Sequence, residues 1–393
     1  MIPRPPYHAA ARSSLSTRDP EMSLGEKLWQ INWSLVVLTV LIALVGFAML
    51  YSAANGNADP WASRQILRFS IGLAIMLAIA LIDVRVLFRY AYLIYFGTLG
   101  LLVAVELIGS SGMGAQRWID LKFMQLQPSE LMKVAIVLAL ARYFHGLTAE
   151  EIGRPFYLVV PIVLTLAPAG LVLKQPDLGT AAMLLMVGTA VFFCAGVRLW
   201  KFAVVGFLGL SAIPIAWQFL HAYQRQRVLT FLNPESDPLG AGYHVMQSKI
   251  ALGSGGLFGR GFLQGSQSHL NFLPEKQTDF IFTMLAEEFG MIGGLSLLGL
   301  YAILLIYGLA IALRSRNQFG RLLAVGVTCN LFLYVFINIA MVMGLLPVVG
   351  VPLLLISYGG TAMLTVMGAL GILMSVYIHR DLRIPRRGPG EAP

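Results

Sequence analysis

The sequence predicts an all-α integral membrane protein of about ten transmembrane helices, with one long extracytoplasmic loop between helices 7 and 8. Three observations support this fold class. Of the 393 residues, 57% are hydrophobic and only 12% are charged, against roughly 25% charged in soluble domains. Apolar runs of about 20 residues, enough to cross a hydrocarbon core of roughly 30 Å, recur along almost the whole chain. A single long stretch, 221–283, interrupts them.

These runs define the expected domains: a tail at 1–31, a ten-helix transmembrane domain at 32–379 that includes the loop 221–283, and a tail at 380–393. The first run follows a polar start and is long enough to span. We therefore expect it to be a retained helix rather than a cleaved signal peptide. The expected spans are 32–51, 66–83, 90–108, 128–144, 157–173, 179–197, 202–220, 284–313, 320–343 and 352–379.

The distribution of Lys and Arg predicts the orientation. An even number of spans places both tails on one side, and basic residues in short loops mark the cytoplasmic side. Both tails and the short loops on their side are richer in Lys and Arg than the opposite short loops. We therefore expect both termini to be cytoplasmic. Chemistry at the opposite, outer face cannot use cytoplasmic ATP, so a substrate there must carry its own leaving group.

Composition and motifs exclude several other classes of protein. The net charge of +9 is explained by basic residues flanking membrane helices rather than by nucleic-acid binding. The glycine-rich GSGGLFGRG lacks the Lys-Ser/Thr ending and the preceding strand of a nucleotide-binding loop. Cys194 and Cys329 lie in apolar runs, so we expect buried packing residues rather than a disulfide or a metal site.

The segment 109–133 carries the first polar cluster. Its glycine-rich start is turn-like, Arg117 follows, and Pro128 opens the next span. Glu130 and Lys133 are three residues apart in that span and share one helix face. They could form only a helix-start ion pair. Alternatively, they could line a polar cavity, because ionisable groups within spans usually face the bundle interior.

The short connection KQPDLGT carries the second cluster, Lys174 and Asp177. Asp177 could simply cap the following helix, and Lys174 could simply anchor it at the interface. Both could instead contribute to a binding site on the outer face. This connection alone identifies no function.

The end of the long loop, LPEKQTDFIFTMLAEEFG, carries the third cluster. Composition predicts that the loop folds as a cap with short amphipathic helices at the membrane surface. Lys276 and Asp279 lie where the next span begins. Asp279 could be a helix-start residue, or a carboxylate whose apolar setting makes it a general base. We expect Glu287 and Glu288 to be surface or interfacial charges.

The segment GLLPVVGVPLLLISYGGTAM, 344–363, precedes or enters the last span. Its prolines punctuate the entry, and Ser357, Gly359 and Gly360 interrupt the apolar pattern. Close helix packing explains the glycines as well as a binding site does. An unwound segment lining a cavity is the alternative.

Taken together, these segments resemble the SEDS family of membrane proteins, and within it the RodA-type elongation branch rather than the division branch. The resemblance spans about 35–380 and rests on the ordered set GAQRWIDL, QPSELMK, KQPDLGTA, RVLTFLNPESDPLGAGYHVMQSKIALGSGGLFGRGF, LPEKQTDFIF with AEEFG, and VGVPLLLISYGG. NPESDPLGAGYH favours the elongation branch. VGVPLLLISYGG departs from the VGLPLPLVSYGG frequent in relatives, which removes the second proline.

The resemblance implies a peptidoglycan glycosyltransferase in the bacterial cytoplasmic membrane. It would polymerise lipid II into β-1,4 glycan strands for elongation and shape, releasing undecaprenyl pyrophosphate. Asp279 matches the family's essential acidic residue, and the expected catalytic role is a general base. Glu130, Lys133 and Arg117 match other family positions. The implied partner is a class B penicillin-binding protein. The residues expected to contact substrate are Arg117, Glu130, Lys133, Lys174, Asp177 and Lys276.

Two ways of holding the substrate diphosphate stay open. Arg117, Lys133, Lys174 and Lys276 could bind it directly, or a divalent cation such as Mg²⁺ or Mn²⁺ could share the task. The sequence shows no dedicated metal cage. Two rival functions also stay open. Ten spans with broken helices fit a flippase for the lipid-linked precursor, and a non-catalytic scaffold could hold the penicillin-binding protein.

Overall fold

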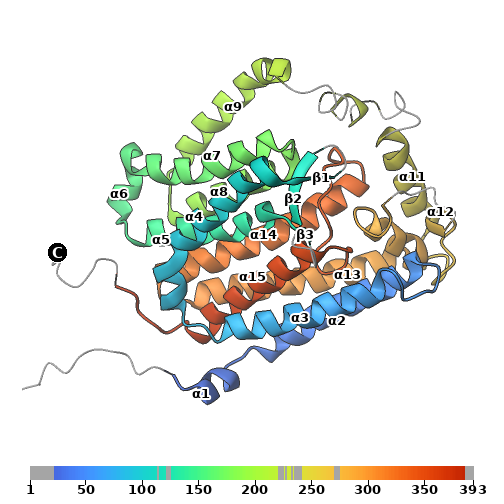
Figure 1. The fold of residues 1–393 in the computed structure, drawn as a ribbon, viewed down its shortest axis with the longest axis horizontal. Helices are drawn as coiled ribbons and strands as arrows, with labels where there is room; N and C mark the ends of the chain where they lie inside the picture. The colour runs from blue at the N-terminus through green and yellow to red at the C-terminus, as the bar shows by residue number, and fades with distance from the viewer. Residues whose placement is uncertain are drawn as a thin grey trace, which may run out of the picture.

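The computed structural model describes residues 22–112, 115–120, 125–219, 225, 228–231, 233, 241–269 and 275–385. Its long helices, apart from α9 (Leu199–Phe219), lie alongside one another as a bundle. α1 (Leu24–Trp29) lies at one end, and α11 (Ala241–Ser254) and α12 (Ser266–His269) lie at the other (Figure 1). The long helices are α2 (Trp33–Ala53), α3 (Ala62–Ala80), α4 (Val84–Ile108), α5 (Pro128–His145), α7 (Val159–Lys174), α8 (Leu178–Ala195), α9 (Leu199–Phe219), α13 (Ile281–Arg314), α14 (Gln318–Val342) and α15 (Gly360–Ile378).

Short elements connect these helices. A three-stranded antiparallel sheet, in the order β1-β2-β3, follows α4. The sequence predicted only a turn-like start for this segment. The remaining elements are α1 (Leu24–Trp29), β1 (Ser110–Gly112), β2 (Ala115–Asp120), β3 (Gln125–Leu126), α6 (Ala149–Gly153), the 3₁₀ turn η1 (Pro155–Leu158), α11 (Ala241–Ser254) and α12 (Ser266–His269).

The predicted fold class is confirmed. Every predicted span coincides with a long helix, and within the described ranges eight helices are long and apolar enough to cross a membrane. Of the other two, α9 contains a shorter apolar stretch, Leu199–Ile215, and α5 carries three charged residues, Glu130, Lys133 and Arg142. The chain is therefore a multi-pass membrane protein.

The last span begins later than the sequence predicted, at Gly360 rather than at 352. The residues before it are not helical. Leu355 has a left-handed backbone with φ of 62°, and the Ser357 hydroxyl accepts from the Leu353 N–H at 2.7 Å. Pro352 disfavours a helical conformation for the residue before it. The unwound segment that the sequence left as an alternative is therefore present.

α14 and α15 lie at the centre of the bundle, where most of their side chains are buried. α14 approaches α5 closely at Gly326, where a Cβ atom would lie only 2.4 Å from Cγ1 of Val137. Small residues allow such close contact between membrane helices. This contact fixes the position of α5, which carries Glu130 and Lys133, relative to α14.

α13 is kinked at Gly290, whose φ of 67° and ψ of −164° are outside the helical region. The two carboxylates before the kink were expected at the surface, but they are buried, with exposed fractions of 0% for Glu287 and 1% for Glu288. Glu287 accepts from the Gln267 backbone N–H at 2.8 Å. Glu288 lies 3.1 Å from Nε2 of His269. These two contacts join the α12 segment to α13.

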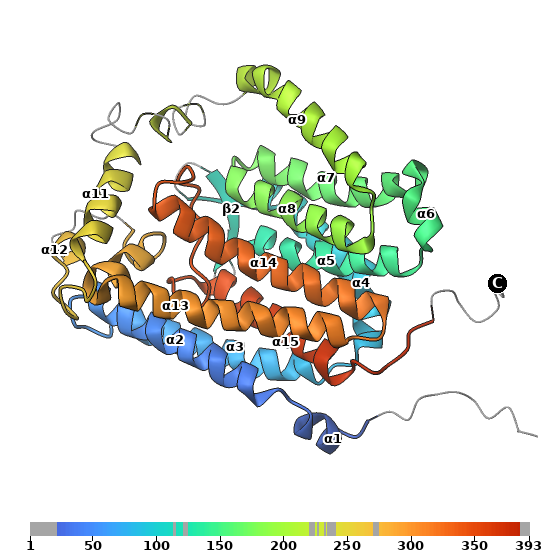
Figure 2. The ribbon, with the colours of Figure 1, turned by 180° about the vertical axis from the view of Figure 1, so that it is seen from behind.

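α9 stands away from the other helices (Figure 2). Most of its side chains are exposed, including Phe207 at 71% and Leu210 at 69%. The expectation of buried cysteines also needs correction at this side of the bundle. Both cysteines are free thiols, but Cys194, near the end of α8, is exposed and Cys329 is half-buried.

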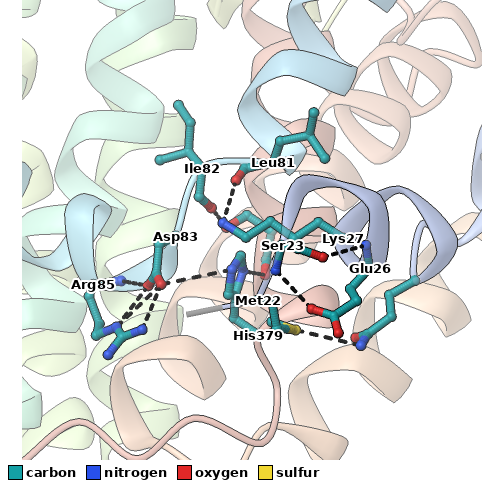
Figure 3. A network of polar contacts seen from close by, with 11 residues as sticks. Met22, Ser23, Glu26, Lys27, Leu81, Ile82, Asp83, Arg85 and His379 are labelled. Carbon is teal, nitrogen blue, oxygen red and sulfur yellow. Dashed lines mark hydrogen bonds and ion pairs between the residues drawn. The ribbon is translucent and has the colours of Figure 1, made fainter. Parts of the chain in front are cut away.

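A polar network holds α1 against the bundle (Figure 3). The Lys27 ammonium donates to the Leu81 carbonyl at 3.0 Å. Asp83 caps α4 and binds the Arg85 guanidinium at 2.9 Å. His379, at the end of α15, lies 4.0 Å from Asp83. The α3–α4 turn, α1 and the end of α15 are thus joined at one end of the bundle.

Candidate functional site

The first part of the site is a buried triad of Glu130, Lys133 and Tyr334. Pro128 opens α5, and the next turn places Glu130 and Lys133 on its inner face. The Lys133 ammonium donates to Oε1 of Glu130 at 2.7 Å, and both residues are at least 97% buried. Tyr334 on α14 donates its hydroxyl to Oε2 of Glu130, and its ring lies 4.1 Å from the Lys133 ammonium. The structure therefore places this pair inside the bundle and away from lipid.

The second part of the site is the backbone of Asp279, which is held by the same face of α14. Asn338, one helical turn after Tyr334, is fully buried. Its amide donates to the Asp279 carbonyl at 3.0 Å and to the Val351 carbonyl at 2.8 Å. One side chain thus connects the start of α13 to the unwound segment before α15. The sequence signal for these residues was present, since Tyr334 and Asn338 are polar residues four apart in an apolar run.

Asp279 itself lies in a turn that ends where α13 begins. The turn depends on Glu275, which has a left-handed φ of 49° and whose carbonyl accepts from the Thr278 N–H at 3.0 Å. A left-handed conformation at a residue other than glycine costs roughly 1–2 kcal/mol. Such strain is concentrated at functional sites.

The unwound segment runs beside this turn. The Tyr358 N–H donates to the Gln277 carbonyl at 2.8 Å, and the Ser357 hydroxyl donates to the Thr278 carbonyl at 2.5 Å. Gly350, with φ of 71°, lies where an added Cβ would be 3.6 Å from Oδ2 of Asp279. The half-buried Asp279 carboxylate is therefore next to this segment.

Lys276 lies in the same turn and is 94% buried. Burial lowers the pKa of its ammonium group below the usual range, because the charged form is desolvated. A cation held in this way, three residues from Asp279, is placed to attract an anionic group of a substrate.

Arg117 and Asp177 are brought together at the start of α8. Arg117, on β2, donates to the Gln175 carbonyl at 3.3 Å and lies 3.9 Å from the Asp177 carboxylate. Asp177 caps α8 by accepting from the Thr180 N–H at 3.1 Å. Near this cap, a Cβ atom on Gly179 would lie 3.0 Å from the Val349 carbonyl. Asp177 thus performs the capping role that the sequence allowed, and its carboxylate also lies near Arg117 of the first cluster.

Lys174 is placed differently from the other predicted site residues. Its side chain is 67% exposed and lies 3.8 Å from the carboxylate of Glu106, which is itself 42% exposed. Exposed ion pairs of this kind contribute about 0–1 kcal/mol. The structure does not place Lys174 together with Asp279.

Sequence reasoning missed two polar residues on α3. The Gln65 amide, fully buried, donates to the Ser357 carbonyl at 3.0 Å. The Arg68 guanidinium lies 4.6 Å from the centre of the Tyr358 ring. Its Nη1 atom is buried and has no hydrogen-bond partner among the described residues. Their spacing of three residues at the start of a span was the available signal.

No group of three or more His, Cys, Asp or Glu side chains that could hold a metal ion occurs within the described parts of the chain. Mg²⁺ is often bound by one or two carboxylates together with substrate phosphates.

Comparison with known proteins assigns the chain to a family. The family model for the cell cycle proteins FtsW, RodA and SpoVE matches residues 28–382. The chain belongs to this family. Among its relatives, the peptidoglycan glycosyltransferase MrdB of Escherichia coli K12 is 47% identical over 351 residues, covering 88% of this chain and 94% of that protein.

Solved structures of the family share the fold. A chain of a peptidoglycan synthase complex, solved to describe the coordination of polymerization and crosslinking, matches with a TM-score of 0.78 and 34% identity, covering 90% of this chain and 99% of that one. The rod shape determining protein RodA of Thermus thermophilus matches with a TM-score of 0.68 and 30% identity, covering 90% and 98%. The predicted SEDS resemblance is therefore confirmed.

Proposed function

We propose that this protein is a peptidoglycan glycosyltransferase that polymerises lipid II into β-1,4 glycan strands at the outer face of the cytoplasmic membrane. One observation carries the proposal. A half-buried carboxylate, Asp279, lies at the start of α13, with its backbone fixed by Asn338 and its side chain beside Gly350. The 47% identity to a peptidoglycan glycosyltransferase supports the same reaction.

Asp279 acts as the general base in this proposal. It accepts the proton of the 4-hydroxyl group on the acceptor sugar, while that oxygen bonds to the anomeric carbon of the donor. The bond from this carbon to the diphosphate breaks, and undecaprenyl pyrophosphate leaves with the electron pair. Attack opposite the leaving group converts the α-linked donor to a β-1,4 linkage. A positioned base typically contributes 10²–10⁴-fold to such a step.

The cations of the site have different proposed roles. Lys276 and Arg117 are the first candidates to contact the diphosphate, because charge-assisted hydrogen bonds stabilise developing negative charge. Lys133 is already paired with Glu130, so we propose that this pair positions α5 against α14 beside the substrate. Lys174, which is exposed, is assigned to the rim of the site, and the buried Asp177 is assigned to holding Arg117. The diphosphate itself could retain Mg²⁺ or Mn²⁺.

We further propose that both termini are cytoplasmic and that a class B penicillin-binding protein is the partner. The basic residues of the tails and inner loops support this orientation. It places Asp279 at the outer face, where a crosslinking enzyme could act on new strands.

The deciding experiment is to supply purified lipid II to the purified protein, alone and together with the penicillin-binding protein. We expect polymeric glycan and released undecaprenyl pyrophosphate, and we expect Asp279→Asn to abolish both. A flippase would instead move labelled lipid II across liposome membranes without forming polymer. A scaffold would form no polymer, and its effect on the partner would survive the Asp279→Asn change. Either result would contradict the proposal.

A further inference from the structure

A pocket of about 730 Å³ lies where α5, α8, the start of α14 and the segment after α15 meet. It is remote from the candidate site. Arg321 of the pocket and Asn338 of the site are on the same helix, and 17 residues at ~1.5 Å per residue separate them by roughly 26 Å. The proposed glycosyltransferase reaction gives this pocket no role.

The chain after α15 forms one wall of this pocket. The backbone N–H of Arg316 donates to the Arg380 carbonyl at 2.9 Å. The Asn317 amide donates to the Leu382 carbonyl at 3.2 Å. His145 completes the wall, because its Nδ1 accepts from the Phe319 N–H at 3.2 Å and its protonated Nε2 then donates to a carbonyl of the same segment at 3.4 Å. The pocket is therefore built from hydrogen-bonded walls.

Positive charge dominates the pocket. Arg316, Arg321 and Arg383 line it, and none of its described lining residues is Asp or Glu. Arg316 is paired with Asp381 at 3.2 Å. In the part of the chain that the structure describes, Arg321 and Arg383 have no acidic partner within 4.0 Å. Two guanidinium groups are thus available to bind phosphate oxygens, for which their planar donor geometry is suited.

The surroundings of the pocket are apolar on one side. Cys194 and Ile384 are among its lining residues. Phe193, next to Cys194 on α8, is 58% exposed, and Trp200 at the start of α9 is 59% exposed. Exposed Trp side chains mark the boundary between membrane and water. A ligand with a phosphate group in the pocket could therefore place acyl chains against the outer surface of α8.

We propose that this pocket binds the phosphate group of an anionic phospholipid, through Arg321 and Arg383. Basic pockets between transmembrane helices on the cytoplasmic side are suited to such head groups. A soluble phosphate ester has the same binding chemistry, but it would gain nothing from the apolar surface next to the pocket. A bound lipid would join the segment after α15 to α8 and α14.

The test compares the full-length protein with Arg321→Gln/Arg383→Gln. Matched control changes are Arg89→Gln/Arg154→Gln, two exposed arginines that do not line the pocket. Each protein is reconstituted with phosphatidylglycerol and phosphatidylcholine of identical acyl chains, and the lipid retained after purification is measured by native mass spectrometry. We expect the unchanged protein and the control to retain more phosphatidylglycerol than phosphatidylcholine. In the pocket variant, the ratio of retained phosphatidylglycerol to phosphatidylcholine should fall about tenfold. Sodium pyrophosphate serves as the soluble competitor and should displace little lipid.

Three results would overturn the proposal. The pocket variant could retain the full preference, the control could lose it equally, or pyrophosphate could displace the lipid at equal concentration. Thermal unfolding checks that each variant is folded, and Arg321→Lys/Arg383→Lys preserves the charge if the glutamine variant is unstable. Because lipid retention is measured without any turnover, failure here is distinct from failure of the glycosyltransferase assay.

Discussion

Tyr334 and Asn338 lie one turn apart on α14, and each binds a different part of the candidate site. The Tyr334 hydroxyl donates to Glu130, and the Asn338 amide donates to the backbone carbonyl of Asp279. A single helix face therefore sets the distance between the buried ion pair and the proposed base. This arrangement makes α14 the reference element of the site.

Asn338→Leu tests this role of α14. The change keeps the size of the side chain but removes the donors to two backbone carbonyls, and an unsatisfied buried polar group costs about 1–3 kcal/mol. We expect a five- to hundredfold lower kcat for lipid II polymerisation, with a smaller change in KM. Asn330→Leu is the control, since Asn330 is also buried on α14 but two turns away. Equal losses in both variants would show a general effect on packing.

A second prediction concerns Glu130 and Lys133. Removing either charge leaves its partner buried and unpaired, which costs about 3–5 kcal/mol. We expect Glu130→Gln and Lys133→Met each to lower both thermal stability and polymerisation. The double variant should recover stability but not turnover. If the double variant regained full turnover, the pair would have a purely structural role.

The third prediction is that Asp279→Asn lowers turnover by about 10²–10⁴-fold. Asn keeps the size of the side chain but cannot accept a proton at neutral pH. Binding of lipid II and of the penicillin-binding protein should largely survive. Glu275→Gln is the comparison, because exposed Glu275 accepts hydrogen bonds within the same turn. Near-normal polymerisation by Asp279→Asn would instead make Glu275 the next candidate base.

A fourth prediction concerns pH and His379. Burial lowers the pKa of the His379 imidazole below 6.5, and its contact with Ser375 and the nearby Asp83 carboxylate only partly oppose this. The unfolded chain therefore binds a proton that the folded protein excludes, so acidification through pH 6.5 destabilises the fold. The loss is at most about 1.4 kcal/mol per pH unit.

The measurement for this prediction is the thermal midpoint at pH 7.5 and 5.5, compared with that of His379→Gln. The variant should lose less stability on acidification. Asp83 does not contribute in this range. Burial alone would raise the pKa of its carboxyl, but hydrogen bonds from Arg85 outweigh burial and keep that pKa below 3.8. An unchanged pH dependence in the variant would exclude His379 as the responsible group.

The fifth prediction concerns orientation. In a Cys194→Ser/Cys329→Ser background, a membrane-impermeant thiol reagent added from outside should label a cysteine at position 237, which lies outside the described residues, and spare one at 316. Permeabilised cells provide the control, since both positions should then react. The reverse pattern would place Asp279 on the cytoplasmic side and remove the basis for outer-face chemistry.

Hydrophobic run length was enough to predict the membrane class and each long helix, because spanning segments must satisfy their backbone internally as helices. It could not predict the start of α15. Residues 352–359 are as apolar as the helix that follows, and their unwound path depends on contacts with Gln65 and Gln277. The buried state of Glu287 and Glu288 was hidden for a similar reason. Their partners lie in segments about 20 or more residues away.

The candidate site was predictable in its ionisable members and not in the residues that hold them. Asp279, Lys276 and Glu130 were recognisable because charges are rare in this sequence. The residues that hold them donate hydrogen bonds to backbone carbonyls or to a partner carboxylate, and only the folded arrangement reveals these contacts. They are Tyr334, Asn338 and Gln65. For Lys174, the sequence predicted a contact with substrate. In the structure its side chain is exposed and paired at the surface with Glu106.

The unwound segment before α15 has a consequence for reading mutational scans. At Gly46 on α2, an added Cβ would lie 2.7 Å from the Ile356 backbone, and at Gly179 it would lie 3.0 Å from the Val349 carbonyl. Even alanine at either position would displace this segment, which is hydrogen-bonded to the turn that carries Asp279. A scan scored by growth would then rank Gly46 among the most sensitive positions, although a glycine has no side chain to offer a substrate. Sensitivity at such positions reflects the packing of the unwound segment. Only assays that measure substrate binding and turnover separately distinguish this packing effect from a direct role in catalysis.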